Sequence, residues 1–248
     1  VKIVREMAYQ DGADDFRPIT FMDFKNPDGL LHVGDGSDEE PFVVGITTRA
    51  LLTRLDRDPS TFIFHIDTTF KLSQVGYSVL VMGISDRSRS FHLVAFCILS
   101  QRIESVYTAA LSAFRAIYTG TTGKQIRLKF VMGDAESGQL TALEQVFRHD
   151  SDFMFLMCFF HVMKKVQEKT KCLLDRVANG VLAQIYDMHF CSSFPELVQA
   201  TNCYWKDDLE AFAAYFKSQW LGARFSRWQC CYAAPGFANT DNPVEQFN

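Results

Sequence analysis

The sequence lacks the marks of a membrane or secreted protein. None of its apolar runs reaches the length that crosses a bilayer, and its start shows no basic segment followed by an apolar one. Its 7 cysteines are odd in number and have no framework spacing. This pattern argues against a disulfide scaffold and favours a reducing compartment, the cytosol or the nucleus.

The chain also lacks an excess of positive charge. It has 25 Lys and Arg against 29 Asp and Glu, which gives a formal net charge of -4. Nucleic-acid affinity rests largely on lysine and arginine side chains at phosphates. A DNA-binding function therefore requires that the basic residues gather on one face, or that flanking segments supply most of the binding.

What the chain does have is the composition of an ordinary globular protein, with 48% hydrophobic and 22% charged residues. Its 248 residues are enough to bury the core of one large domain, or of one domain and part of a second. It starts with Val1 rather than Met and stops at what reads as the start of a helix. We expect it to be a fragment of a longer protein.

Four segments are expected along the chain. Residues 1–45 are polar and turn-rich and read as an appended segment, with an edge strand near 19–24. Residues 46–178 form the organised core, which opens with a short helix at 47–55 capped by Thr47 or Thr48. Residues 179–232 are helical and aromatic and read as an insertion. Residues 233–248 begin a further core helix.

The core has an alternation of elements that favours an α/β fold. Apolar runs with strand and helix periodicity predict strands at 62–66, 77–84 and 91–99, a helix at 104–118, a strand at 126–132, a helix at 136–147, a strand at 153–157 and a helix at 161–177. Three antiparallel strands followed by two parallel ones, flanked by helices, is the ribonuclease H-like mixed sheet. In that fold the first and fourth strands are neighbours.

Three acidic residues stand at the edges of apolar segments. They are Asp67, Asp134 and Glu245, and the neighbouring first and fourth strands would place Asp67 beside Asp134. Three converging carboxylates make an all-oxygen cage suited to Mg²⁺ or Mn²⁺. Two such ions are the usual means of breaking and joining phosphodiester bonds.

Each acid taken alone also has a structural explanation. Asp67 can form a turn, and Asp134 can cap the helix that follows it. Asn242 can cap a helix that begins at Pro243, which puts Glu245 where a capping box has its acid. The order of the three acids on the fold carries more weight than any one of them.

Several ordered motifs resemble a known family. They are HIDTTFKLSQVGY (65–77), GISD (83–86), FHLVA (91–95), VMGDA (131–135), ALEQVF (142–147), MCFFHVMK (157–164) and NTDNPVEQFN (239–248). Over residues 42–248 the chain is similar to Mutator-like element (MULE) transposase domains, of the DDE-type ribonuclease H-like superfamily. The match is carried by the order of the motifs as well as by their residues.

The resemblance implies a catalytic domain of a DNA transposase. It implies an acidic triad at Asp67, Asp134 and Glu245 that binds two Mg²⁺ or Mn²⁺ ions and performs DNA strand cleavage and strand transfer. The implied partners are transposon terminal repeats, target DNA and further copies of the chain, in the nucleus and away from membranes. Family members usually carry zinc-binding modules near their ends, and this sequence shows none.

Cys158 and His161 form a Cys-x-x-His pair that also marks these transposases. The plain alternative is a buried thiol and a histidine at a helix start. A zinc site joining this pair to His189 and Cys191 matches no standard finger spacing, so we expect no zinc in this segment. The adjacent cysteines at 230 and 231 read as free thiols.

Basic residues gather on the helix expected at 161–177. Lys164 and Lys165, followed by Lys169, Lys171 and Arg176, form either a solvated helix face or a surface that contacts DNA. Arg224 and Arg227 precede Glu245 and can grip phosphate, while Trp228 either stacks on an unpaired base or packs inside the insertion.

Two rival functions remain open. An aspartyl-phosphate phosphotransferase would need a second acid two residues after Asp67, where Thr69 stands, and another Asp a few residues after Asp134, where Ser137 and Gly138 stand. A domesticated transposase relative that binds DNA as a transcriptional regulator would keep the fold and lose the chemistry. The intact acids favour retained catalysis.

Overall fold

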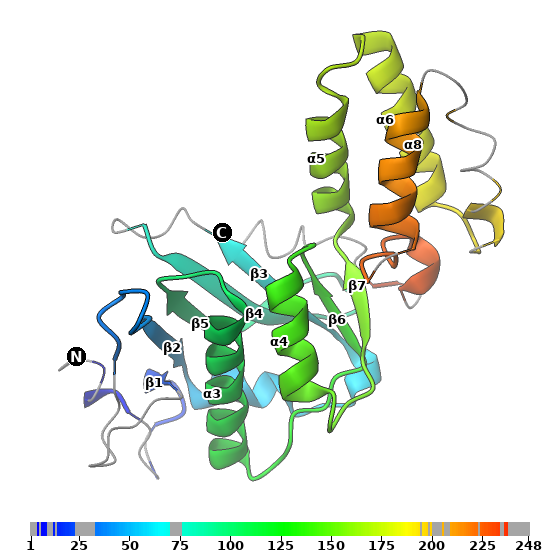
Figure 1. The fold of residues 1–248 in the computed structure, drawn as a ribbon. Helices are drawn as coiled ribbons and strands as arrows, with labels where there is room; N and C mark the ends of the chain where they lie inside the picture. The colour runs from blue at the N-terminus through cyan, green and yellow to red at the C-terminus, as the bar shows by residue number, and fades with distance from the viewer. Residues whose placement is uncertain are drawn as a thin grey trace.

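The computed structural model describes residues 4, 6–8, 12, 14–22, 33–69, 76–193, 195–197, 199, 205, 209–222, 224–233 and 236–237. Within these ranges the chain forms a central mixed sheet with two helices on one face and a helical bundle at one end (Figure 1). None of the described helices is long and apolar enough to cross a membrane.

The sheet has seven strands in the order β1-β2-β5-β4-β3-β6-β7. Their bounds are β1 Ile19–Phe21, β2 Val43–Thr47, β3 Ile63–Thr69, β4 Ser78–Ser85, β5 Phe91–Leu99, β6 Phe130–Gly133 and β7 Met154–Met157. β3, β4 and β5 are antiparallel, whereas β6 pairs in parallel with β3 and with β7. This is the α/β, ribonuclease H-like arrangement that the element order predicts.

β1 and β2 extend the sheet beyond β5, and β2 was not predicted. Its sequence Val43-Val-Gly-Ile-Thr47 is short, yet it pairs with β5 along four residue positions. The short helix α2, Arg49–Leu52, follows at once, and Thr48 caps it by accepting from the Leu51 backbone N–H at 3.1 Å. Two 3-10 turns, η1 Thr53–Leu55 and η2 Pro59–Thr61, lead into β3. The predicted cap is thus confirmed at Thr48.

β4 is buried along its whole length and carries an irregularity at one glycine. The pairing of β4 with β5 shifts register between Met82 and Gly83. A Cβ atom at Gly83 would lie 2.3 Å from the Phe91 ring, so only glycine fits there. The register shift therefore falls where a side chain is missing.

One face of the sheet is covered by α3, Glu104–Thr122, and α4, Ser137–Phe147 (Figure 1). The side chains that the periodicity of these helices turns inward are buried against the sheet: Val106, Ala110, Ala113, Phe114, Leu140, Leu143 and Phe147. The opposite face carries a smaller cluster in which Phe237 packs with Ile63, Met132 and Leu156. The C-terminal part of the described chain thus returns to this second face.

The single helix expected at 161–177 is two helices, so that prediction is wrong. α5 runs over Phe159–Thr170 and α6 over Asp175–His189. Leu174 adopts an extended backbone (φ -60°, ψ 139°) before α6, and the Thr170 hydroxyl bonds back to the Val166 carbonyl at 3.0 Å. A local side-chain bond of this kind competes with helix continuation. Asp175 then opens α6, where an acid suits the helix N-terminus.

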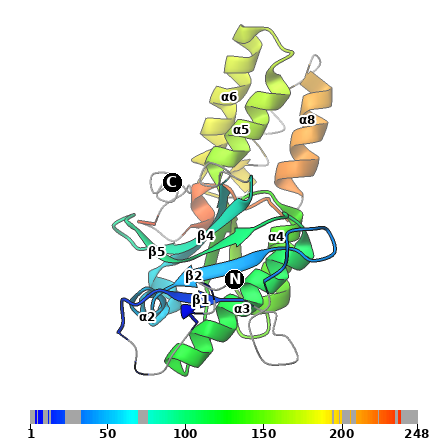
Figure 2. The ribbon, with the colours of Figure 1, turned by 90° about the vertical axis from the view of Figure 1, so that its left-hand side faces the viewer.

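The region after α6 contains further helices, as predicted, and no strand among the residues that the structure describes. α8, Glu210–Phe216, continues into a π-helical turn, η4 Lys217–Leu221, and a 3-10 turn, η5 Cys230–Tyr232, follows. Figures 1 and 2 show α5, α6 and α8 side by side, projecting from the end of the sheet where β7 finishes. The predicted segment boundary between 178 and 179 falls inside α6, and the domain division remains a prediction.

The bundle is held together by a stack of rings. The His189 ring lies 3.7 Å from the Phe159 ring at an interplanar angle of 5°, and the Trp228 ring is nearly parallel to the Phe159 ring at a centroid distance of 5.9 Å. Trp228 is 2% exposed, so it packs inside the bundle rather than against a DNA base. A hydrogen bond of 2.8 Å joins His189 Nδ1 to the Trp228 carbonyl.

This stack makes the stability of the bundle depend on pH. Burial lowers the pKa of His189, although the bond to Trp228 acts in the opposite direction. The folded chain therefore prefers a neutral imidazole, and its stabilising contribution is complete above the unfolded pKa of about 6.5 and is lost as pH falls below it. Urea unfolding at pH 7.5 and 5.5 should show the wild type losing up to about 1.4 kcal/mol per pH unit more than His189→Asn. Equal pH slopes would contradict this assignment.

Candidate metal centre

The pairing of β3 with β6 brings two of the predicted acids together. Phe64 lies opposite Val131, and His65 lies opposite Met132 in parallel register. Two residues further along each strand direction, Asp67 in β3 and Asp134, directly after β6, occupy equivalent positions. Because side chains alternate along a strand, Asp67 falls on the same side as Ile63, and Asp134 on the same side as Met132. Ile63 and Met132 belong to the cluster on the second side of the sheet, away from α3 and α4.

Asp67 lies within a strand rather than at its end. The predicted strand stops at 66, whereas β3 continues to Thr69 because β4 pairs with it as far as Thr69 and Val79. The β-branched residues Thr68 and Thr69 suit this extension. Asp67 is consequently only 6% exposed, and its backbone is fixed by the sheet.

Asp134 follows β6 directly, at a point where the two strands approach closely. A Cβ atom at Gly133 would lie 3.0 Å from Gln139 Oε1 and 3.0 Å from a methyl carbon of Ile66. Gln139 is 1% exposed, and its Nε2 donates to Thr68 Oγ1 at 3.3 Å. Glycine before the acid therefore lets α4 and β3 pack against the start of the Asp134 loop.

His161 is the third member of the group. The Cys158 backbone N–H donates to the Gly133 carbonyl at 3.1 Å, which ties the start of α5 to the end of β6. His161 lies in the first turn of α5, and its Nδ1 atom is 2.6 Å from Asp134 Oδ1. The two side chains are 18% and 20% exposed, so the pair is open to solvent on one side only.

Asp67, Asp134 and His161 form a compact set of ligand atoms. One ligand atom from each lies within 4.8 Å of the others, and in the part of the chain that the structure describes no other such group of three His, Cys, Asp or Glu residues occurs. Neighbouring ligands of an octahedral ion with bonds of 2.0–2.1 Å are about 3 Å apart, so small side-chain shifts suffice. Two carboxylates and an imidazole are a ligand set that can hold a divalent metal ion.

A hydrogen-bond network supports the two acid-bearing loops from behind. Tyr107, a fully buried residue of α3, donates to Glu136 Oε1 at 2.9 Å and lies 3.3 Å from Thr68 Oγ1. Burial raises the pKa of Tyr107 to about 12, so its hydroxyl keeps its proton. Arg102 completes the network through an ion pair of 2.5 Å with Glu136. The network links Thr68, next to Asp67, to Glu136, two residues after Asp134.

Sequence reasoning missed this network. Glu136 reads as the start of a helix, and the structure places it as the residue before α4, with its carboxylate bound by Tyr107 and Arg102. The one sequence signal for this network is that Glu136 is an acid two residues after Asp134. Nothing in the sequence marks Tyr107, which reads as an ordinary inward residue of α3.

The other predicted site residues have varied positions. Glu245 lies outside the described residues. Cys158 is fully buried and packs with Met132 and Leu156. His161 lies at the acids, whereas His189 Nε2 is 3.2 Å from Cys230 Sγ, so these two histidines belong to different clusters.

The predicted arginines are engaged in packing. Arg224 bonds to Thr141 and forms an ion pair with Glu144, both on α4. The Arg227 carbonyl accepts from the Met157 backbone N–H at 2.9 Å, which covers the free edge of β7. The Arg224 side chain and the Arg227 backbone therefore tie this segment to the core, and the contact of the two arginines with DNA remains a prediction.

Residues 63–165 match the family model described as the MULE transposase domain. This segment is similar to MULE transposase domains. The match starts at the first residue of β3 and ends inside α5, so it includes Asp67, Asp134 and the Cys158/His161 pair. Comparison with curated proteins finds no match. The MULE family identified from the sequence motifs is thus confirmed.

The centre should bind a divalent ion through its acids. Asp67→Asn and Asp134→Asn each remove a charged ligand and should weaken Mn²⁺ binding at least about tenfold, and His161→Gln should weaken it about 10- to 100-fold. Titration calorimetry with MnCl₂ measures this directly. Asp150→Asn, which alters an acid paired with Arg115 on the α3 side, is the matched control and should bind as the wild type does. Equal affinity in all four variants would exclude a metal site here.

The supporting network should be worth a measurable part of the stability. Tyr107→Phe leaves Glu136 Oε1 without its buried donor and should lower the free energy of unfolding by about 1–3 kcal/mol. It should also lower Mn²⁺ affinity, because the Thr68 hydroxyl, on the residue next to Asp67, loses its contact with the Tyr107 hydroxyl. Urea unfolding and calorimetry on the same variant separate the two effects. Lost stability with unchanged Mn²⁺ affinity would show that the network does not position the acids.

Proposed function

We propose that this chain is the catalytic domain of a DDE-type DNA transposase, which cleaves DNA strands at transposon ends and joins them to target DNA with Mg²⁺ or Mn²⁺. The observation that carries the proposal is the Asp67, Asp134 and His161 group, which lies inside the MULE transposase segment. Carboxylates of this kind, held at adjacent strand positions, are what two-metal phosphodiester chemistry requires.

The chain's own residues have separate tasks in this proposal. Asp67, buried in β3, offers a ligand whose backbone is held by pairing with β4. Asp134 is oriented by His161 at 2.6 Å, which either shares the ion or holds the carboxylate in place for it. A bound divalent ion would lower the pKa of a water molecule and polarise the scissile phosphate. No nucleophilic side chain is needed.

Glu245 is proposed as the third acid. The last described residue, Phe237, packs with Ile63 and Met132 on the second face of the sheet. Eight further residues can reach about 27 Å when extended, so the intervening chain is long enough to return to the centre. Its role rests on the family resemblance of the segment 239–248.

The proposed partners follow from the reaction. Transposon terminal repeats and target DNA are the substrates, and joining two ends to one target calls for more than one active site. We therefore propose a homo-oligomer assembled on DNA, acting in the nucleus. The net charge of -4 implies that the DNA contacts lie on limited surfaces or on segments outside this sequence.

Strand cleavage and strand transfer on labelled DNA carrying the element's terminal repeats test the proposal. The protein containing this chain should nick and join such DNA with Mg²⁺ or Mn²⁺ and not with EDTA. Asp67→Asn, Asp134→Asn and Glu245→Gln should each lower the rate about 100-fold or more, because metal stabilisation is worth several kcal/mol. Asp150→Asn should leave it unchanged.

One outcome would favour the domesticated regulator instead. Binding of DNA without any metal-dependent cleavage, unaffected by Asp67→Asn, would mean that the fold is used for recognition alone. Magnesium-dependent hydrolysis of a small phosphoester would in turn point to phosphatase-type chemistry at the same acids.

A further inference from the structure

One face of α5 is exposed and leads away from the metal centre. Phe160, Lys164 and Lys171 are spaced by four and seven residues, so they lie on the same side of the helix. Lys171, the residue after the last turn, keeps a helical backbone (φ -55°, ψ -27°). Eleven residues at 1.5 Å each give this α5 face a length of about 16 Å. It starts beside His161, the neighbour of Phe160 in sequence.

Phe160 is not needed by the protein core. The opposite side of α5 carries the buried Val162, Met163 and Val166, and the preceding Phe159 enters the ring stack of the bundle. Phe160 is 48% exposed, and its ring meets the His161 ring edge to face at 5.5 Å. An aromatic ring is therefore held open to solvent directly beside the candidate metal ligands.

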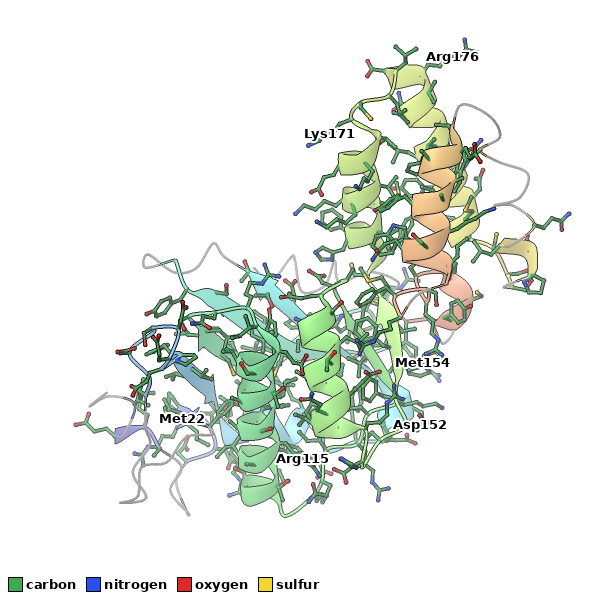
Figure 3. The ribbon with its side chains drawn as sticks, viewed as in Figure 1. Met22, Arg115, Asp152, Met154, Lys171 and Arg176 are labelled. Atoms are coloured by element: carbon green, nitrogen blue, oxygen red, sulfur yellow. The ribbon has the colours of Figure 1, made fainter. Side chains whose placement is uncertain are left out.

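The lysines of α5 divide into two classes. Lys165 Nζ lies 3.3 Å from Glu168, and Lys169 Nζ lies 5.1 Å from the Tyr215 ring, so both have partners within the bundle. Lys164 and Lys171 have no ion-pair partner among the residues that the structure describes. Figure 3 shows Lys171 on the side of α5 that points away from α6 and α8. The unpaired lysines thus share the face of Phe160.

We propose that the α5 face binds an unpaired DNA strand that runs into the metal centre. A base next to the reacting phosphate stacks on Phe160, and phosphates further along the strand lie at Lys164 and Lys171. The inference deepens the proposed function, since the strand is the one to be cut. It accounts for local binding by a chain whose net charge is negative.

The chemistry of the α5 face favours an unpaired strand over other partners. Lys164 and Lys171, which have no acidic partner in the described part of the chain, complement phosphates, and the face is continuous with the metal centre. The Phe160 ring can stack only on a base that is unpaired and out of the DNA duplex. A fully paired duplex would contact the lysines and not the ring. Stacking is independent of base identity, so this face supplies position rather than sequence preference.

Fluorescence anisotropy in EDTA measures strand binding without any cleavage. The probes are a labelled duplex with a single-stranded 3′ extension and a fully paired duplex of the same sequence. Phe160→Ala should weaken binding of the extended probe about 5- to 100-fold, which corresponds to the usual effect of removing one stacked base. Phe160→Trp should retain binding, and Phe160→Leu, which keeps apolar bulk without a ring, should not.

The lysines provide a matched comparison. Lys164→Ala with Lys171→Ala should weaken binding and reduce the slope of log affinity against log salt by about 1.4, since each phosphate contact of a single strand contributes about 0.7. Lys165→Ala with Lys169→Ala removes the same charge from the same helix and should change affinity less than twofold. Circular dichroism confirms that each variant folds.

Three results would overturn the inference. They are wild-type affinity in Phe160→Ala, an equal loss for the paired duplex, or an equal loss from the Lys165 and Lys169 pair. These readouts are independent of catalysis. A protein that binds the extended probe through Phe160 but never cleaves would refute the proposed function alone, whereas a cleaving enzyme indifferent to Phe160 would refute only this inference.

Discussion

The parallel pairing between β3 and β6 is the constraint on which the rest of the site depends. These strands are far apart in sequence and joined through β4, β5 and α3, yet their register places Asp67 and Asp134 at the same level. The close approach at Gly133 and the bond from Cys158 to its carbonyl then fix α4 and α5 around that point. Ligand geometry is thus set by backbone pairing, with little left to side-chain freedom.

Sequence periodicity predicted those elements whose apolar pattern is long and regular. The strand expected at 91–99 coincides with β5, and α3 and α4 bury the side chains that their spacing turns inward. β2 was missed because its five residues become a strand only through pairing with β5. The break before Leu174 was missed because a polar, lysine-rich helix pattern continues across it, and the competing bond of Thr170 is local.

The site could be predicted only in part, for a related reason. Asp67 and Asp134 have recognisable residue types in a recognisable order, which is enough to bring them forward as candidates. The 2.6 Å contact of His161 depends on how α5 starts from β7, and the Glu136 network depends on Tyr107 from a distant helix. Spacing along a chain does not contain such contacts, because they arise from packing between layers.

The bond between Cys158 and Gly133 also sets a limit on how the chain can vary. It fixes the point at which α5 starts, and only two residues separate Cys158 from His161. One residue inserted there would turn the imidazole about 100° around the helix axis and move it 1.5 Å along that axis, away from Asp134. Among the described residues, the loop at 171–174 has no comparable hydrogen bond to the sheet. Insertions and deletions in this family should therefore accumulate in the loop between α5 and α6 and be absent from the segment between Cys158 and His161.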